Sequence, residues 1–197
     1  MPEFSFDPQT HTYTLDGREL ISATGILRAC GVIDGSWFNE AARARGEAVH
    51  AACQFEAEGD LEESSLAPEI APYLEQYKLA VAALGFKPTS CEQPIYHKAL
   101  LYACTPDQVG LVEGKLALLE LKTGTMQPWT ALQTALQSMA VWPEGFMSAN
   151  RYGLELRPDG YKLSKFGEFS DFSMATAMVA VAKWKQANCK EIKNGNQ

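Results

Sequence analysis

Residues 107–122 read Asp-Gln-Val-Gly-Leu-Val-Glu-Gly-Lys-Leu-Ala-Leu-Leu-Glu-Leu-Lys, and this stretch decides the fold. The runs on either side of Glu113-Gly114, 108–112 and 115–120, are mostly apolar, as expected of strands. Glu113-Gly114 is typical of a two-residue hairpin turn, because glycine adopts a positive φ without steric cost. The sequence therefore predicts a central β-hairpin.

The register of this hairpin brings charged side chains together at one end. If Val112 pairs with Lys115, Asp107 lies directly opposite Glu120. Residues two apart on a strand share a face, so Lys122 joins Glu120 there. The sequence therefore predicts that two carboxylates and an amine converge beside mostly apolar neighbours.

Two carboxylates this close indicate a metal site. Asp107 and Glu120 repel each other unless a cation lies between them. Oxygen ligands of this kind suit Mg²⁺ or Mn²⁺. We therefore expect a divalent cation at the end of the hairpin.

Length and composition indicate one domain. The chain has 197 residues, of which 46% are hydrophobic, enough for a packed core. No apolar run approaches the roughly 20 residues that cross a membrane, and Met-Pro-Glu-Phe-Ser-Phe-Asp at the N-terminus lacks the basic and apolar regions of a signal peptide. We expect a single cytoplasmic domain over residues 1–197, with no membrane partner.

Charge and cysteine content argue against several classes of protein. The net charge of −7 disfavours a broad nucleic-acid surface but leaves room for a local basic groove. The five cysteines are scattered and include no Cys-x-x-Cys pair, which argues against a structural zinc site. We expect reduced thiols that serve mainly in packing.

Periodicity and turn residues predict strands and helices around the central hairpin. The expected elements are an N-terminal hairpin over about 4–21, a short helix capped by Ser22 or Thr24 and ending near Gly31, helices over 37–58 and 68–84, a strand over 91–96, a helix over 128–142, a hairpin of 151–157 and 161–166, and a helix over 172–190. This order favours an α/β (α+β) domain with a central mixed sheet flanked by helices.

Further polar residues accompany the hairpin in a recognisable order. They are Arg45-Gly46 with His50, then Glu92, Thr105-Pro106-Asp107, Glu120-Leu121-Lys122-Thr123-Gly124, and Gln133 with Gln137. The set resembles the PD-(D/E)xK nuclease superfamily, in particular its RecB-like and phage exonuclease branch. The resemblance runs from about residue 4 to residue 140, includes Phe6-Asp7-Pro8, His11, Tyr13 and Asp16-Gly17, and implies a restriction-endonuclease-like core.

Two positions depart from the family pattern. Cys104 stands where the pattern often has glycine, and Gln137 replaces the usual tyrosine. The second departure bears on how the helix around Gln137 positions a substrate. Some branches of the family hold an iron–sulfur cluster on several C-terminal cysteines. This chain has only Cys189 in that region, so no iron–sulfur cluster is expected.

The resemblance implies a role for each of these residues. Asp107 and Glu120 bind one or two Mg²⁺ ions, with Mn²⁺ able to substitute and the carbonyl of Leu121 as a further ligand. Lys122 orients or helps deprotonate the attacking water, and His50 binds the metal or orients a metal-bound water. The supporting and DNA-positioning residues are Arg45, Glu92, Thr123 and Gln133.

Each assignment competes with a structural one. Glu120 and Lys122 also fit a surface ion pair, and His50 also fits a core histidine. Glu92 and Gln133 also fit ordinary surface positions. These alternatives depend on how the helices pack against the hairpin.

The function that the resemblance implies is a magnesium-dependent DNA nuclease. The expected type is a phage or prophage exonuclease of recombination or repair, working in the host cytoplasm on DNA, with a recombination protein partner and a homo-oligomeric state as further expectations. Two alternatives stay open. One is a noncatalytic module that binds DNA ends or a recombination partner, and the other is a structure-selective endonuclease.

Overall fold

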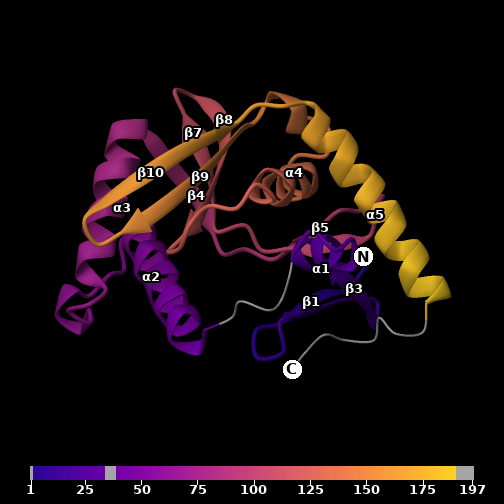
Figure 1. The fold of residues 1–197 in the computed structure, drawn as a ribbon, viewed down its shortest axis with the longest axis horizontal. Coiled ribbons are helices and arrows are strands. Elements are labelled where there is room, and N and C mark those ends of the chain that lie inside the picture. Colours follow the sequence, from indigo (N-terminus) through magenta and orange to yellow (C-terminus); the bar gives the residue numbers. More distant parts are fainter. Residues whose placement is uncertain (1, 34–38, 190–197) are drawn as a thin grey trace.

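A computed structural model describes residues 2–33 and 39–189 (Figure 1). The strands are β1 (Phe4–Asp7), β2 (Thr12–Leu15), β3 (Arg18–Ser22), β4 (Phe86–Cys91), β5 (Ile95–Tyr96), β6 (Tyr102–Cys104), β7 (Gln108–Val112), β8 (Lys115–Lys122), β9 (Asn150–Arg157) and β10 (Gly160–Phe166). The helices are α1 (Ala23–Ala29), α2 (Glu40–Glu58), α3 (Ala71–Leu84), α4 (Thr130–Val141) and α5 (Ser170–Asn188), with short 3₁₀ helices η2 (Glu63–Ser65) and η3 (Phe146–Ser148).

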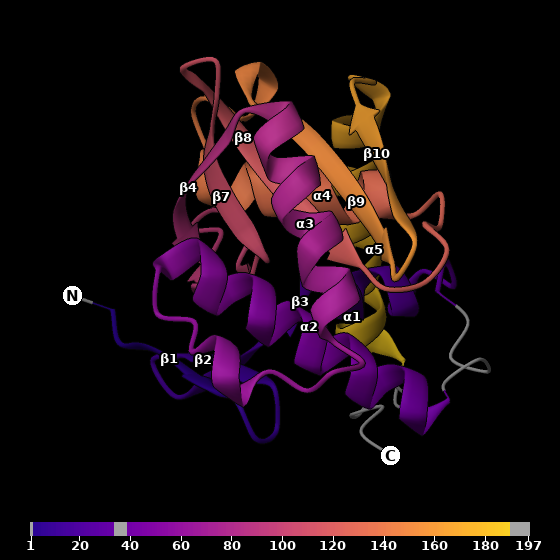
Figure 2. The same cartoon turned by 90° about the vertical axis from the view of Figure 1, so that its left-hand side faces the viewer.

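The larger sheet has the strand order β10-β9-β8-β7-β4 and lies between two layers of helices. Strands β8 and β9 run parallel and the other neighbours run antiparallel. Figure 2 shows α2 and α3 in front of this sheet, with α4 and α5 behind it. One apolar core joins the sheet to α2 and α3, and a second joins α4 to α1 and α5. The predicted class, a mixed α/β fold, is confirmed.

The central hairpin has the predicted register, with pairs running from Val112↔Lys115 to Gln108↔Leu119. Both turn residues, Glu113 and Gly114, have positive φ, at 50° and 75°. This backbone matches the twist of the flanking strands. The turn prediction and the register prediction are therefore confirmed.

Gly110 is required by the neighbouring strand. A Cβ atom at this position would overlap the carbonyl oxygen of Lys87 on β4. Strands β4 and β7 therefore approach each other closely only because residue 110 has no side chain. The hairpin is fixed to the edge strand at this point.

A second sheet holds the N-terminal residues. Its order is β1-β2-β3-β6-β5, and β3 runs parallel to β6. The region predicted as one hairpin over 4–21 is three antiparallel strands, with the expected turn at Asp16-Gly17. The sequence predicted one sheet, because the three-residue strand β6 is too short to show a periodic pattern.

The predicted strand over 91–96 is wrong as a single element. Strand β4 covers 86–91 and pairs with β7, whereas β5 covers 95–96 and pairs with β6 in the other sheet. The break is at Glu92, whose φ is 48°, and is followed by Pro94, which has no N–H for a ladder bond. The sequence did not predict the first part of β4, because Pro88 argues against a strand. The proline is tolerated there because β4 lies at the edge of the sheet.

Helix ends follow the predicted signals closely. The Ser22 hydroxyl accepts a hydrogen bond from the Gly25 N–H at 2.9 Å and caps α1. Gly85, with φ of 65°, ends α3 as predicted. Helix α2 begins at Glu40 after an Asn39 cap, and the predicted start at residue 37 lies outside the described residues, as does the predicted end of the last helix at 190. Within the described ranges, no helix is long and apolar enough to span a bilayer.

Arg151 on β9 joins the sheet to α4 and α5 and is only 1% exposed. Its guanidinium donates to the Ala131 carbonyl at 2.7 Å and to the Asp171 carboxylate at 2.8 Å. It also lies 4.5 Å from the ring centre of Phe172. A buried cation held by these partners is costly to remove alone, because Asp171 then loses its counter-charge.

We expect Arg151→Met to lower the free energy of unfolding by about 3–5 kcal/mol, measured by urea denaturation. The matched control is Arg43→Met, because Arg43 is exposed and its ion pair with Glu47 spans 3.8 Å. That control should change stability by less than about 1 kcal/mol. Equal losses in the two variants would contradict a structural role for the Arg151 cluster.

Candidate metal centre

Asp107 lies where β7 begins, at the end of the hairpin away from the turn. It is 8% exposed, and its Oδ2 atom accepts a hydrogen bond from the Leu121 N–H at 2.6 Å. The Asp107 carbonyl accepts from the Glu92 N–H at 3.1 Å. One residue therefore joins β7 to β8 and to the turn that follows β4.

Three elements bring metal-ligating groups to Asp107. The ligand atoms of His50 on α2, Glu92 after β4 and Asp107 all lie within 4.8 Å of one another. His50 Nδ1 lies 3.4 Å from Asp107 Oδ1 and 3.9 Å from Glu92 Oε1. The two carboxylates and one imidazole therefore form a compact group, which we call the acidic cluster. The sequence predicted only a supporting role for Glu92, whereas the structure places its carboxylate beside His50 and Asp107.

Glu120 lies beside the acidic cluster, in a different environment. It is 2% exposed, and its Oε1 atom accepts from Lys122 Nζ at 2.7 Å and from Gln133 Nε2 at 2.6 Å. Its Oε2 atom accepts from Gln137 Nε2 at 2.8 Å. Both oxygens of Glu120 therefore already have donors. The expectation that Glu120 binds a metal stays a prediction.

Lys122 lies between strand β8 and helix α4. Besides Glu120, its Nζ atom donates to Gln133 Oε1 at 3.3 Å and lies 5.4 Å from the ring centre of Trp129. The Lys122 side chain is 23% exposed, so the amine is mostly covered but keeps a path to solvent. This amine is a fixed positive charge next to the acidic cluster.

Gln137 departs from the family pattern, and this departure bears on how helix α4 positions a substrate. It stands where the family pattern has tyrosine, and in the structure it is 2% exposed and donates to Glu120. Gln133 and Gln137 lie one turn apart on α4, so both amides point to the same carboxylate. The i, i+4 spacing of two glutamines on one helix is the sequence signal for this pair.

The remaining predicted residues lie around the centre. A Cβ atom on Gly46 would lie 3.3 Å from Thr123 Oγ1, so α2 passes close to the chain after β8. Arg45 is exposed on α2 and Thr123 is half-buried. The Leu121 N–H binds Asp107, and the prediction that the Leu121 carbonyl binds a metal stays a prediction.

The charges of the acidic cluster shift the pKa of two groups in opposite directions. Burial by itself lowers the pKa of His50, but the charge of Asp107 and hydrogen bonds to Asp107 and Glu92 outweigh burial and raise it to about 10. Burial raises the pKa of Asp107, but the charge of His50 and of Lys122 lowers it below its usual value. At neutral pH, His50 is therefore protonated and Asp107 is ionised.

The other three groups have raised pKa values. Burial, and then the charge of Asp107, raises the pKa of Glu120. Burial is also the main cause of the raised pKa of Glu92. Burial lowers the pKa of Lys122, but the charges of Glu120 and Asp107 outweigh it and raise the pKa. Lys122 is thus a permanent cation here.

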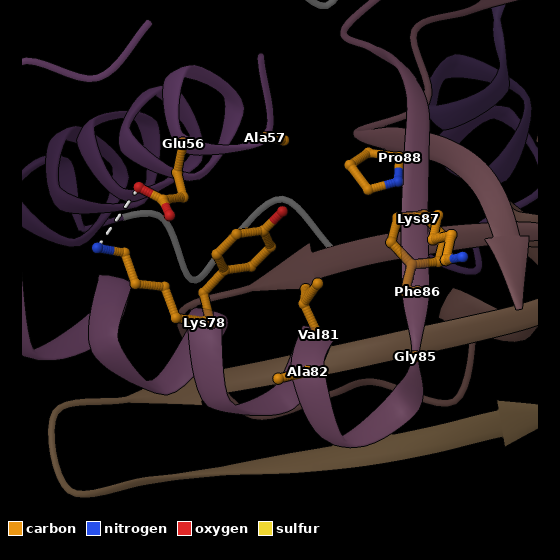
Figure 3. A pocket seen from close by; sticks show the side chains of 10 residues that line it. Glu56, Ala57, Lys78, Val81, Ala82, Gly85, Phe86, Lys87 and Pro88 are labelled. Atoms are coloured by element: carbon orange, nitrogen blue, oxygen red, sulfur yellow. Dashed lines mark ion pairs between the residues drawn. The ribbon is translucent and has the colours of Figure 1, made fainter. Parts of the chain in front are cut away.

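Another hollow of the molecule lies away from these groups, between α2, α3 and β4 (Figure 3). It has a volume of about 380 Å³ and includes Tyr77, Val81 and Phe86 in its walls. Glu56, the carboxylate in its lining, is paired with Lys78 at 3.5 Å. It therefore lacks the converging ligands that the acidic cluster has.

Comparison with known proteins gives matches at the level of structure. Neither protein-family models nor curated proteins match this chain. An alkaline exonuclease (LHK-Exo) from Laribacter hongkongensis is 15% identical over 85% of this chain and 88% of its own, with a TM-score of 0.45. LHK-Exo in complex with dAMP is 13% identical over the same shares, with a TM-score of 0.40.

A second protein of this kind is a candidate exonuclease from Eubacterium rectale. It is 9% identical over 83% of this chain and 73% of its own, with a TM-score of 0.46. At such identities and TM-scores, these likenesses carry no argument about activity.

Without a metal ion, we expect the melting temperature to fall as the pH rises from about 6.5 to about 10. The folded protein raises the pKa of His50 from 6.5 to about 10, so the contribution of the protonated ring is complete below pH 6.5 and is lost as the pH rises through 10. Mn²⁺ should stabilise the protein more at pH 9 than at pH 6.5, because the ion and the proton compete for His50. Thermal melts in EDTA and in Mn²⁺ measure both effects.

The control for this prediction is His50→Gln, which removes the titrating ring. Its melting temperature in EDTA should depend less on pH over the same range. A pH dependence that is identical in the variant and the original protein would show that His50 does not cause it.

Proposed function

We propose that this protein is a metal-dependent nuclease that hydrolyses phosphodiester bonds in DNA. The observation that carries the proposal is the acidic cluster of His50, Glu92 and Asp107, with the fixed cation Lys122 beside it. A site that places carboxylates next to a lysine suits a phosphate, provided that a metal ion offsets the negative charge.

The donor set fits a divalent cation. Three carboxylates, those of Glu92, Asp107 and Glu120, lie near two cations, His50 and Lys122. Carboxylate oxygens suit Mg²⁺, and the imidazole of His50 is also a good ligand for Mn²⁺. When bound, such an ion polarises the scissile phosphate and acidifies a water. His50 would hold such an ion as a neutral ligand and would therefore have to lose its proton.

The neighbouring residues have separate tasks in this proposal. Lys122 stays protonated because its pKa is raised, so it donates hydrogen bonds to the phosphate or to the attacking water and does not act as a base. Glu120 holds the Lys122 amine in place at 2.7 Å. Gln133 and Gln137 in turn fix both oxygens of Glu120. The network is a positioning device built on α4.

Finer assignments also belong to this proposal. The resemblance to the PD-(D/E)xK superfamily supports an exonuclease of phage or prophage type in recombination or repair, acting in the cytoplasm. A recombination protein partner and a homo-oligomer remain predictions. DNA contacts by Arg45 and Thr123 also remain predictions. These two residues lie on the two segments that meet at Gly46.

A second candidate function is a noncatalytic module that binds DNA ends on the same fold. The observation that favours it is that the two oxygens of Glu120 already accept three hydrogen bonds, which compete with a metal ion for this carboxylate. If those bonds persist when a metal is present, they leave few lone pairs of Glu120 for the ion. Cleavage therefore separates the two functions.

The proposal predicts magnesium-dependent loss of end-labelled linear DNA, with covalently closed circles spared if the enzyme is an exonuclease. Lys122→Ala should lower the cleavage rate by about 10²–10³-fold, the usual cost of one group that stabilises developing charge. The matched control is Lys87→Ala, because Lys87 is an exposed lysine on the edge strand β4. It should keep full activity.

Two outcomes would change the assignment. No cleavage of linear, single-stranded or circular DNA with either Mg²⁺ or Mn²⁺, together with retained DNA binding, supports the noncatalytic module. Cleavage of closed circles supports the structure-selective endonuclease.

A further inference from the structure

A hollow of about 500 Å³ opens directly beside the acidic cluster. One wall comes from the N-terminal strands and the loop between them, and the other from α2, which lie next to each other in both views (Figures 1 and 2). The lining residues are Phe6, Pro8, His11, Gly46, Glu47, His50, Ala51, Gln54, Glu92 and Thr105. The volume is within the range of small-ligand sites.

The hollow is continuous with the acidic cluster, because His50 and Glu92 belong to both. Thr105, which also lines the hollow, stands two residues before Asp107. A molecule that places a phosphate at the acidic cluster therefore has its next group at the mouth of this hollow.

The loop of residues 8–11 in one wall is fixed in advance. Asp7 accepts hydrogen bonds from the Gln9 N–H at 2.9 Å and from the Thr10 hydroxyl at 2.8 Å. His11 has a φ of 52°, which is uncommon for a residue with a side chain. The hydrogen bonds of the loop itself hold this strained backbone in one conformation. Ligand binding therefore requires no further loss of conformational entropy in the loop.

Hydrogen bonds also tie this wall to the strand that carries Asp107. The Tyr13 hydroxyl lies 2.8 Å from Thr105 Oγ1 and 3.3 Å from His11 Nε2. Phe6 stacks on Tyr13 with ring centres 4.7 Å apart and meets His11 edge to face at 5.2 Å. Aromatic rings therefore stand at a fixed place relative to the acidic cluster.

The character of the lining distinguishes between an anionic and a neutral occupant. Its two carboxylates, Glu47 and Glu92, outnumber its one protonated imidazole, His50, so the lining disfavours an anion that has no metal ion beside it. Phe6, Pro8 and the ring of His11 offer flat apolar surface. A neutral, flat, aromatic group suits such a wall, and in a nucleic acid that group is the base.

We propose that this hollow is a nucleobase pocket, in which Phe6 and His11 receive the base of the nucleotide whose phosphate lies at the acidic cluster. The inference rests on the proposed function for the position of the phosphate. It assigns the N-terminal sheet a direct part in substrate binding. Because ring faces are common to all bases, the pocket accepts any base without reading sequence.

The test compares two ligands that differ only in the base, thymidine 5′-monophosphate and 2-deoxyribose 5-phosphate. Calorimetric titration in Mn²⁺ should show the original protein binding the nucleotide about tenfold more tightly, the usual contribution of one stacked base. Phe6→Leu keeps an apolar side chain but removes the ring, and His11→Ala removes the ring at the rim. In both variants the preference should fall to about twofold or less.

The matched control is Phe55→Leu, which changes an exposed phenylalanine on α2 that is not part of the lining. It should keep the tenfold preference, and binding of 2-deoxyribose 5-phosphate should be the same in all four proteins. Equal melting temperatures for His11→Ala and the original protein keep the test independent of folding.

The outcomes separate this inference from the proposed function. If the original protein cleaves DNA but binds the two ligands equally, the pocket proposal fails and the nuclease proposal stands. If it cleaves no DNA but keeps a base preference that depends on Phe6, the pocket stands and the nuclease proposal fails. A preference that survives in both variants overturns the pocket.

Discussion

The hydrogen bond from the Leu121 N–H to the Asp107 carboxylate, 2.6 Å long, is the interaction on which the site depends. It closes the open end of the central hairpin and holds a nearly buried negative charge at a fixed place. A buried carboxylate needs compensation, and the nearby His50 and Lys122 supply it from α2 and β8. The positions of Glu92, Glu120 and the glutamines of α4 are arranged around this charge.

The site divides into two connected parts with different partners. In one part, His50, Glu92 and Asp107 lie close enough to share a single cation. In the other, Lys122 and the amides of α4 hold Glu120. The carboxylates of Glu92 and Asp107 face one cation, His50, within the acidic cluster, whereas Glu120 accepts three hydrogen bonds from Lys122 and the α4 amides. This contrast explains why the first part suits a metal ion and the second suits a positioning role.

The two sheets have separate duties. The larger sheet shares one apolar core with α2 and α3, which holds the hairpin in register. The second core joins α1, α4 and α5 to β6 of the smaller sheet. The smaller sheet packs around Tyr13, Leu20 and Ala103, and it carries the loop that borders the hollow beside the acidic cluster. Strand β6 joins the two functions, because it belongs to the smaller sheet and leads directly to Asp107.

The sequence by itself determined the hairpin, its register and the convergence of Asp107, Glu120 and Lys122, because side-chain alternation and turn chemistry are local properties of a strand pair. It also determined the start of α1, through Ser22, and the end of α3, through Gly85. Strand β6 and the break at Glu92 were decided by tertiary pairing, since a three-residue strand and a positive φ leave no periodic signal. The packing of α2 decided that His50 lies beside Glu92 and Asp107. The packing of α4 decided that Gln133 and Gln137 hold Glu120. The tertiary structure alone could decide both, because helix orientation depends on contacts between residues far apart in the chain.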